Sequence, residues 1–213
     1  SLWWREPEAE VLPALEEHRH PTPAERSSAL VLVVVGYFKK VVVADHLSAT
    51  VESVYGGARA GSMLYWLATL MFAFQIYFDF SGYSDIARGL ARLMGYEFPL
   101  NFDHPYTARS MRELWQRWHI SLSTWFRDYV YVPLGGNRRS ATRNLWITML
   151  ASGIWHGASL TFLVWGAWHA LWLSVERWTR WPERAVSSVV GRVVAMPFVF
   201  LLTLLGWVFF RAS

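Results

Sequence analysis

The sequence has no cysteine among its 213 residues, and it lacks charged residues over several long stretches. Without thiols the chain has no disulfide, no thiolate ligand for zinc and no cysteine nucleophile to carry an acyl group. The longest charge-free stretch, residues 144–175, runs for 32 residues, and other such windows cover residues 27–38, 60–78 and 193–210. Uncharged windows of this length predict helices that cross or enter a membrane.

Aromatic and apolar residues are abundant, with 14 Trp and 54% hydrophobic residues. Tryptophan favours the interfaces of a bilayer, and the basic residues lie beside the apolar windows instead of forming one tract. The net charge of +4 is therefore explained by membrane topology, and we predict no nucleic-acid partner. We expect the protein to be surrounded by membrane lipids.

We predict a single partial domain over residues 1–213, an all-α polytopic membrane helix bundle with interfacial amphipathic helices. The chain begins at Ser1 without methionine or signal peptide, so we expect a fragment of a larger many-helix fold. The predicted parts are a polar loop (1–26), membrane helices (27–78), a cytoplasm-side amphipathic insert (79–143), a broken or paired membrane segment (144–175) and a membrane helix (193–210).

Residues 144–175 are too long to cross a bilayer as one straight helix. At about 1.5 Å per residue the helix would measure about 48 Å, against about 30 Å for the hydrocarbon core. Glycine tolerates non-helical backbone, so we expect the break at Trp155-His156-Gly157. Irregular backbone survives at membrane depth only beside protein or a water-filled cavity. His156 is therefore expected to border a cavity.

A second histidine, His119, lies on a predicted amphipathic helix. Ser110 and Glu113 form a capping-box pattern, and apolar residues follow at helical spacing over about four turns. Arginines occupy the other side, so this helix is expected to lie along the interface. His119 falls on the apolar stripe and would face the interior. The stripe comprises Met111, Leu114, Trp115, Trp118, Leu122, Trp125 and Phe126.

A neutral histidine is one of few side chains that accept a proton near pH 7. Acyl transfer from a thioester to a hydroxyl needs positioned substrates, a base for the hydroxyl proton and stabilisation of the oxyanion. His156 suits the base, and His119 suits a partner that orients it. From the residues alone, the alternative that His156 is a satisfied interior polar group stays open. His169 is interpreted as a structural or supporting residue.

Other polar residues near the apolar windows have structural explanations. Lys39 and Lys40 interrupt the first apolar run, which predicts that this segment emerges at an interface or that the lysines snorkel. Asp79, Ser81 and Asp85 lie outside any nucleophile-elbow pattern, so we interpret them as helix-terminus caps or interface groups. None of these residues is assigned to chemistry.

Three arginines occupy a glycine-rich loop between two apolar windows. Arg138, Arg139 and Arg143 are candidates for binding the phosphates of a nucleotide or coenzyme A, and equally for determining topology. His18 and His20 lie in the polar N-terminal part and are interpreted as solvated. We predict no metal site.

Four strings in this sequence together resemble the membrane-bound O-acyltransferase family, most closely its bacterial alginate O-acetylase branch. They are Asp79-Phe-Ser-Gly-Tyr-Ser-Asp85, Arg117-Trp-His-Ile-Ser-Leu-Ser123 with Trp125-Phe-Arg-Asp-Tyr129, Pro133-Leu-Gly-Gly-Asn-Arg-Arg139 and Trp155-His-Gly-Ala158. Their order and spacing, rather than any single string, carry the resemblance, which extends from about residue 28 to Arg211.

The resemblance implies a many-helix fold with a tunnel, in which His156 is catalytic and His119 is its partner. We expect no bound cofactor, acetyl-CoA as acyl donor, and a location in the bacterial inner membrane with several passes. The expected function is transfer of acetyl across the membrane for O-acetylation of an exopolysaccharide such as alginate. The expected partner is a periplasmic acetyl-acceptor protein or transferase.

Several alternatives remain at this stage. Peptidoglycan O-acetylation or teichoic-acid D-alanylation would use the same chemistry on another acceptor or donor. A transporter or channel would also use intramembrane histidines and a broken helix, although no inverted repeat is visible. A noncatalytic membrane subunit that docks a partner would not need either histidine.

Overall fold

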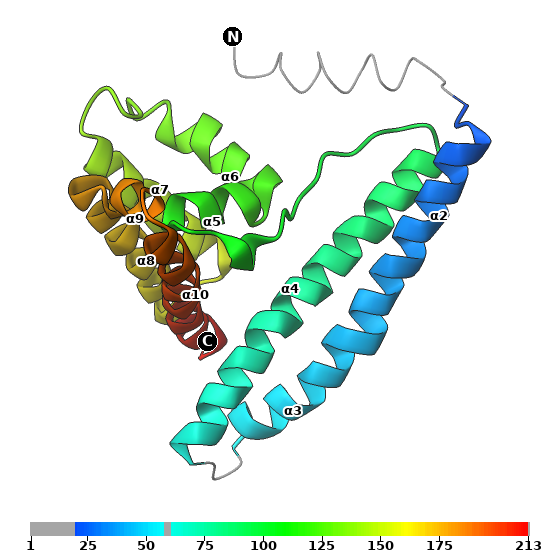
Figure 1. Ribbon diagram of the computed structural model, residues 1–213, viewed down its shortest axis with the longest axis horizontal. Helices are drawn as coiled ribbons and strands as arrows, with labels where there is room; N and C mark the ends of the chain where they lie inside the picture. Colours follow the sequence, from blue (N-terminus) through cyan, green and yellow to red (C-terminus); the bar gives the residue numbers. More distant parts are fainter. Residues whose placement is uncertain (1–19, 58–60, 213) are drawn as a thin grey trace. The chain divides into compact units, whose positions relative to one another are not determined.

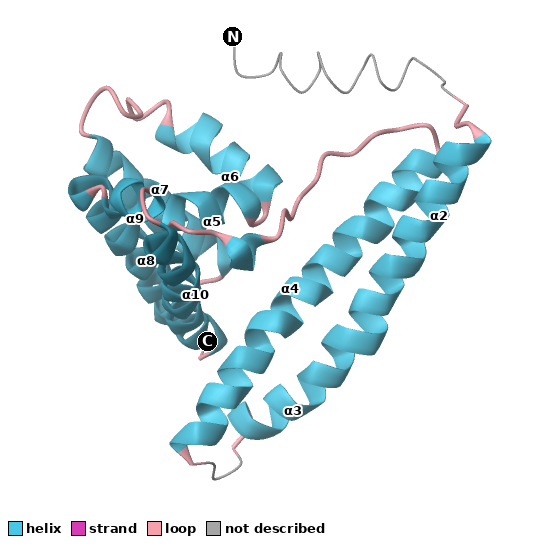
Figure 2. Cartoon of the chain, in the orientation of Figure 1, coloured by secondary structure: helices cyan, strands magenta, loops and turns pink. Residues whose placement is uncertain are grey.

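The computed structural model describes residues 20–57 and 61–212, and all their regular structure is helical, as Figure 2 shows. This confirms the predicted all-α class. The chain forms two compact units, one of Ser1–Ala49 and Phe74–Leu100, the other of Thr50–Ala73 and Asn101–Ser213. Most of the expected N-terminal loop, with His18, lies outside the described residues, whereas His20 is described and exposed.

Three helical stretches are long and apolar enough to cross a membrane: Pro23–Tyr55, Ser62–Leu93 and Val189–Arg211. The helices, labelled in Figure 1, are α2 (Pro23–Tyr37), α3 (Asp45–Tyr55), α4 (Ser62–Leu93), α5 (Met111–Arg117), α6 (Ile120–Phe126), α7 (Ala141–His156), α8 (Leu160–Thr179), α9 (Trp181–Val186) and α10 (Val189–Arg211). Two π-helical turns, η1 (Phe38–Ala44) and η3 (Arg127–Tyr131), and a 3-10 turn, η2 (Pro105–Thr107), complete the described elements.

In the first unit, α2 packs closely against the C-terminal part of α4 through glycine. A Cβ atom on Gly36 would lie 2.6 Å from the carbonyl oxygen of Gly82, and one on Gly82 would lie 2.7 Å from that of Gly36. Small residues allow helix backbones to approach where lipid provides no hydrophobic drive between them. This contact therefore fixes the register of the two helices.

Ion pairs neutralise the lysines that interrupt the first apolar run. Lys39 Nζ lies 2.6 Å from Asp85 Oδ2, and Lys40 Nζ lies 2.7 Å from Asp79 Oδ1. The interpretation of both aspartates as terminus caps is wrong, because α4 continues through them to Leu93. Residue 79, the expected start of the polar insert, lies inside α4. Opposite charges in an apolar helix pair are held together because each alone is costly to bury.

In the second unit, the predicted break in residues 144–175 is confirmed. Helix α7 ends at His156, and α8 begins at Leu160 and folds back along it. Glycine again permits the close approach: a Cβ on Gly153 would overlap the Phe162 carbonyl, and one on Gly166 would lie 2.5 Å from the Met149 oxygen. At 16 residues, α7 measures about 24 Å, less than the hydrocarbon core of about 30 Å.

The apolar face of the amphipathic segment packs into the second unit. Met111 and Leu114 of α5 are buried with Ala108 and with Val199 and Leu202 of α10. The expectation that this stripe faces the interior is confirmed at these positions. The packing holds α5, and the turn that follows it, against the helices around His156.

Candidate active site

His156 is the last residue of α7, immediately before the break, and its side chain is half-buried. Its ring is 5.1 Å from each of the Trp165 and Phe210 rings, centroid to centroid, and 6.1 Å from that of Phe162. A Cβ on the next residue, Gly157, would lie 2.7 Å from the Phe162 ring, so glycine is needed for this turn. His156 is thus enclosed by aromatic rings on several sides without being fully buried.

His119 lies at a break that the sequence pattern did not predict. The expected continuous helix after Ser110 is wrong, because α5 ends at Arg117 and α6 begins at Ile120. His119 adopts the left-handed conformation with φ 43° and ψ 58°, which is uncommon for a residue other than glycine. Half of the expected capping box is present, since Ser110 Oγ accepts a hydrogen bond from Glu113 N at 2.9 Å.

The surroundings of His119 keep its ring neutral. Burial, and to a smaller extent the charge of the nearby His156, lowers the pKa of His119 to about 4. Its Nδ1 atom lies 3.2 Å from Oδ1 of Asn101, and its ring packs 6.2 Å from that of Phe102. Near pH 7 the side chain is therefore an uncharged imidazole.

Trp155 links the two histidines. Its ring centroid lies 6.5 Å from that of His119 and 5.0 Å from that of His156, with edge-to-face geometry in both pairs. The structure thus brings together two imidazoles from segments that are 37 positions apart in the sequence. Two half-buried imidazoles beside one indole form a site suited to proton transfer.

His169 occupies the interior of the second unit, where its side chain is 3% exposed. Its ring lies 4.9 Å from that of Trp165 and 5.2 Å from that of Trp115. Its Nδ1 atom is buried without a hydrogen-bond partner in the described part of the chain. Trp165 lies between His169 and His156, so His169 supports the wall of the site rather than lining its opening.

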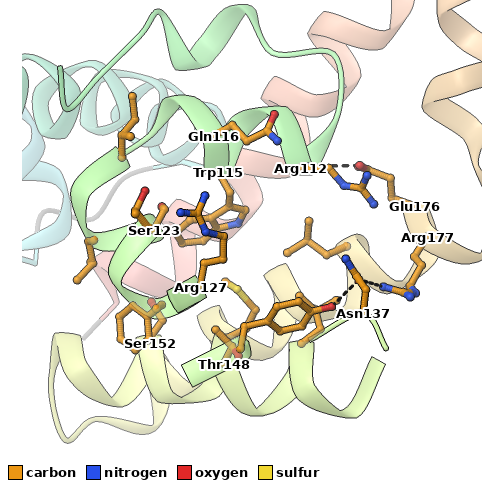
Figure 3. A pocket seen from close by; sticks show the side chains of 18 residues that line it. Arg112, Trp115, Gln116, Ser123, Arg127, Asn137, Thr148, Ser152, Glu176 and Arg177 are labelled. Carbon is orange, nitrogen blue, oxygen red and sulfur yellow. Dashed lines mark hydrogen bonds between the residues drawn. The ribbon is translucent and has the colours of Figure 1, made fainter. Parts of the chain in front are cut away.

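A pocket of about 470 Å³ lies between α5, α6, α7 and α8, and neither His119 nor His156 is among the residues that line it. Ser152 and Thr148 of α7 form its buried side, and Ser152 lies one helical turn before His156. The Ser152 Oγ and Trp115 Nε1 atoms are buried, and within residues 20–57 and 61–212 they have no hydrogen-bond partner. Figure 3 shows both side chains at the pocket.

Three arginines line this pocket: Arg112, Arg127 and Arg177, as Figure 3 shows. Arg112 and Arg127 are exposed, and Arg177 donates a hydrogen bond to Asn137 Oδ1 at 2.9 Å. The pocket therefore has three arginines at its rim, of which Arg127 also pairs with Asp128 at 2.6 Å, and its interior holds Ser152 and Thr148 among apolar side chains. No sequence pattern indicated that the three arginines converge, because they belong to three separate elements.

The arginines singled out from the sequence lie elsewhere. Arg138, Arg139 and Arg143 are exposed and do not line the pocket. Their loop is held by Asn144, whose Nδ2 donates to the carbonyl oxygens of Gly136 at 3.1 Å and Arg139 at 2.6 Å. This arrangement gives the loop a fixed shape at the start of α7.

Like the pocket arginines, Glu176 was not indicated by the sequence pattern. It lies at the pocket, is 7% exposed, and accepts a hydrogen bond from Met111 N at 2.7 Å. The N–H groups of the first turn of a helix need such acceptors. A carboxylate from α8 thus anchors the start of α5 and with it the segment that leads to His119.

The described residues contain no group of three or more His, Asp or Glu side chains that could hold a metal ion. The histidines of the site are accompanied by aromatic rings and an amide instead.

Comparisons with known proteins point to one family. The model of the membrane-bound O-acyltransferase family matches residues 28–211. A probable alginate O-acetylase of Pseudomonas aeruginosa is 44% identical over 203 residues, which cover 92% of this chain and 38% of the relative. A probable alginate O-acetylase of Pseudomonas fluorescens is 47% identical over 189 residues, which cover 84% of this chain and 36% of the relative. A peptidoglycan O-acetyltransferase of Helicobacter pylori is 38% identical over 211 residues, which cover 96% of this chain and 40% of the relative.

The helices and the imidazole site are those of a helical membrane protein. The chain belongs to the membrane-bound O-acyltransferase family. It spans 36–40% of the length of the relatives described above. Both histidines and the pocket lie within the matched residues.

Proposed function

We propose that the whole protein is an O-acyltransferase of the bacterial inner membrane, with several passes, that transfers acetyl from acetyl-CoA for O-acetylation of an exopolysaccharide such as alginate. The observation that carries this proposal is the pairing of His119 and His156 around Trp155 in a chain of this family. The similarity to probable alginate O-acetylases supports an exopolysaccharide as the polymer that is acetylated.

In the proposed reaction, His156 is the base. The hydroxyl oxygen of the acceptor attacks the thioester carbonyl carbon, and its proton moves to a nitrogen of His156. As the tetrahedral intermediate collapses, the C–O ester bond remains, the C–S bond breaks and the thiolate receives the proton from His156. No covalent acyl-protein intermediate is required. His119 orients His156 or the acceptor hydroxyl by a hydrogen bond.

The pocket beside the site supports a thioester donor with an anionic, extended carrier group. Arg112, Arg127 and Arg177 suit phosphates, because guanidinium groups bind them with charge-assisted hydrogen bonds. Ser152 and Trp115 offer buried hydrogen-bonding atoms to the amide groups of the donor arm. Since Ser152 lies one turn from His156, the acyl end of such an arm would point toward the base.

The acceptor is proposed from the relatives, and two other acceptor pathways use the same chemistry. The Helicobacter relative named peptidoglycan O-acetyltransferase matches 96% of this chain, which favours that pathway as the second candidate. The expected periplasmic acceptor protein or transferase belongs to the same proposal. D-alanyl transfer would need a carrier protein as donor instead of acetyl-CoA.

The test uses the full-length protein in proteoliposomes with acetyl-CoA labelled in the acetyl group. We expect label to reach a periplasmic acetyl-acceptor protein or alginate, and no transfer from a D-alanyl carrier protein. Transfer to peptidoglycan fragments alone would replace the proposed polymer. Failure of every acyl donor to react, in vesicles that instead take up ions or polymer, would favour a transporter and overturn the enzyme assignment.

A further inference from the structure

Asn101 holds the His119 turn at two points. Its backbone oxygen accepts a hydrogen bond from Ile120 N at 2.9 Å. Its side-chain oxygen, Oδ1, lies 3.2 Å from His119 Nδ1 and 3.1 Å from Ser121 N. One residue thus contacts three successive positions across the left-handed turn.

The contact with Ser121 N fixes which way the Asn101 amide points. The oxygen and nitrogen of an amide are often assigned by their hydrogen bonds. The backbone N–H of Ser121 only donates, so the atom that it contacts is the amide oxygen. The same atom therefore faces His119, and it has no hydrogen to give.

An acceptor oxygen at Nδ1 dictates the tautomer of His119. Since Oδ1 only accepts, Nδ1 carries the hydrogen, and a neutral imidazole has only one N–H. The hydroxyl of Ser121 lies 3.4 Å from Nδ1 but 3.0 Å from Oδ1, so the amide oxygen is its nearer acceptor. When Nδ1 donates to the same oxygen, the lone pair of His119 is on Nε2.

We propose that Asn101 is a positioning residue that keeps His119 in the Nδ1–H tautomer, so that Nε2 acts as the hydrogen-bond acceptor in the site. The proposal rests on the proposed role of His119 in acyl transfer. Nε2 then accepts a hydrogen bond from the N–H of His156, which leaves the other His156 nitrogen as base, or from the acceptor hydroxyl itself.

A merely structural role for Asn101 is the competing explanation, because Oδ1 also caps the first turn of α6 through Ser121 N. Asn101→Asp separates the two roles. Aspartate keeps the cap and the acceptor at Nδ1, but its charge raises the pKa of His119. Asn101→Ala removes both the cap and the tautomer control.

Two pairs of titratable or charged groups flank the turn. On the adjoining segments, Asp103 pairs with His104 at 3.1 Å, and Arg117 pairs with Glu113 at 2.6 Å. His156 faces His119 from α7 across Trp155. Asp103→Asn is therefore the matched control, since it changes one charge two positions from Asn101 without touching His119.

The decisive measurement is nitrogen NMR of the full-length protein in bilayers with 15N-labelled histidine, with His119→Gln to assign the signal. We expect a protonated Nδ1 and an unprotonated Nε2 at His119, and appearance of the other tautomer in Asn101→Ala. An Nε2–H signal in the unsubstituted protein, or an unchanged tautomer in Asn101→Ala, overturns the proposal.

Activity provides the second measurement. We expect Asn101→Ala to lower kcat about 10- to 100-fold with KM for the donor unchanged. Asn101→Asp should move the acid limb of the kcat profile to higher pH by about one to three units, and Asp103→Asn should not. If the pH profile of kcat does not move in Asn101→Asp, the proposal is overturned and Asn101 only caps α6. Full activity of His119→Gln refutes the proposed function instead, because the NMR tautomer does not depend on turnover.

Discussion

The two units carry polar groups in their apolar helices in different ways. In the first unit, Lys39 and Asp85 are fully charged groups that neutralise each other at 2.6 Å. In the second unit, His119, His156 and His169 lie among aromatic rings, and none of the salt bridges found in the described residues includes them. The lysine and aspartate of the first unit are paired charges, whereas the three histidines of the second unit stand outside any such pair among the described residues.

The difference separates structural from chemical use of polar side chains. Burying a charge is costly, so an ion pair inside a helix pair must be locked, and its atoms are not available for reaction. A neutral imidazole costs less to bury and can still accept a proton. We therefore expect substitutions at the ion pair of the first unit to affect stability and those at the histidines of the second unit to affect catalysis.

The largest effect is expected at the histidine pair. His156→Ala should lower polymer O-acetylation by about 10²- to 10⁴-fold, because the base is lost. His119→Ala should cause a severe loss and His169→Ala a milder one, since His169 only supports the wall. The measurement is acetyl content of the polymer, with membrane insertion of each variant verified.

His104→Ala is the matched control for these variants, because this histidine also has a left-handed backbone but is exposed. It should retain normal O-acetylation. Full activity of His156→Ala would reject the assigned base.

The next effect concerns the ion pair of the first unit. Lys39→Met removes the 2.6 Å partner of Asp85 and leaves it only the longer contact with Arg88, at 3.8 Å, so it should destabilise the protein by up to about 3 kcal/mol. Adding Asp85→Leu should recover much of this loss, because the carboxylate that lost its close partner is removed. Thermal unfolding in detergent measures the change.

Glu97→Gln serves as the reference for the ion pair, because the Glu97 side chain is exposed and its pair with Arg92 should contribute less than about 1 kcal/mol. Equal destabilisation by Lys39→Met alone and by the double variant would contradict the interpretation of the pair.

A smaller, kinetic effect is expected at the basic pocket. Arg177→Gln and Arg127→Gln should each raise KM for acetyl-CoA about 10-fold, because each removes a charge-assisted hydrogen bond to phosphate. Arg138→Gln and Arg139→Gln, outside the pocket, should leave KM unchanged. Steady-state kinetics in proteoliposomes measures these KM values. An increased KM for the loop variants with an unchanged KM for the pocket variants would place the donor site at the loop instead.

The smallest effect is expected at the start of α5. Ser110→Ala removes a hydrogen bond to Glu113 N and should cost about 1 kcal/mol. Glu176 still accepts from Met111 N, so the helix should persist with normal O-acetylation. Circular dichroism and thermal unfolding report the change. Loss of the fold in this variant would show that the second cap does not suffice.

Local features of the sequence predicted several elements well. The uncharged windows predicted helices, and the length of residues 144–175 with Gly157 predicted the break after His156. Such features depend on bilayer thickness and on the geometry of single residues, so they can be deduced from neighbours along the chain.

The break at His119 could not be predicted in this way. Apolar residues continue at helical spacing across it, and the left-handed turn depends on Asn101, which is 18 positions away. The pocket arginines could not be predicted either, because Arg112, Arg127 and Arg177 come together only when several helices have packed.

The sequence by itself therefore determined the helical class, the apolar segments and the two histidines worth attention. Only the tertiary structure decided that these histidines meet at Trp155, that Lys39 pairs with Asp85, and that three distant arginines share one pocket. The physical reason is range: periodicity and propensity act over a few residues, whereas a site is made by contacts between segments that packing brings together.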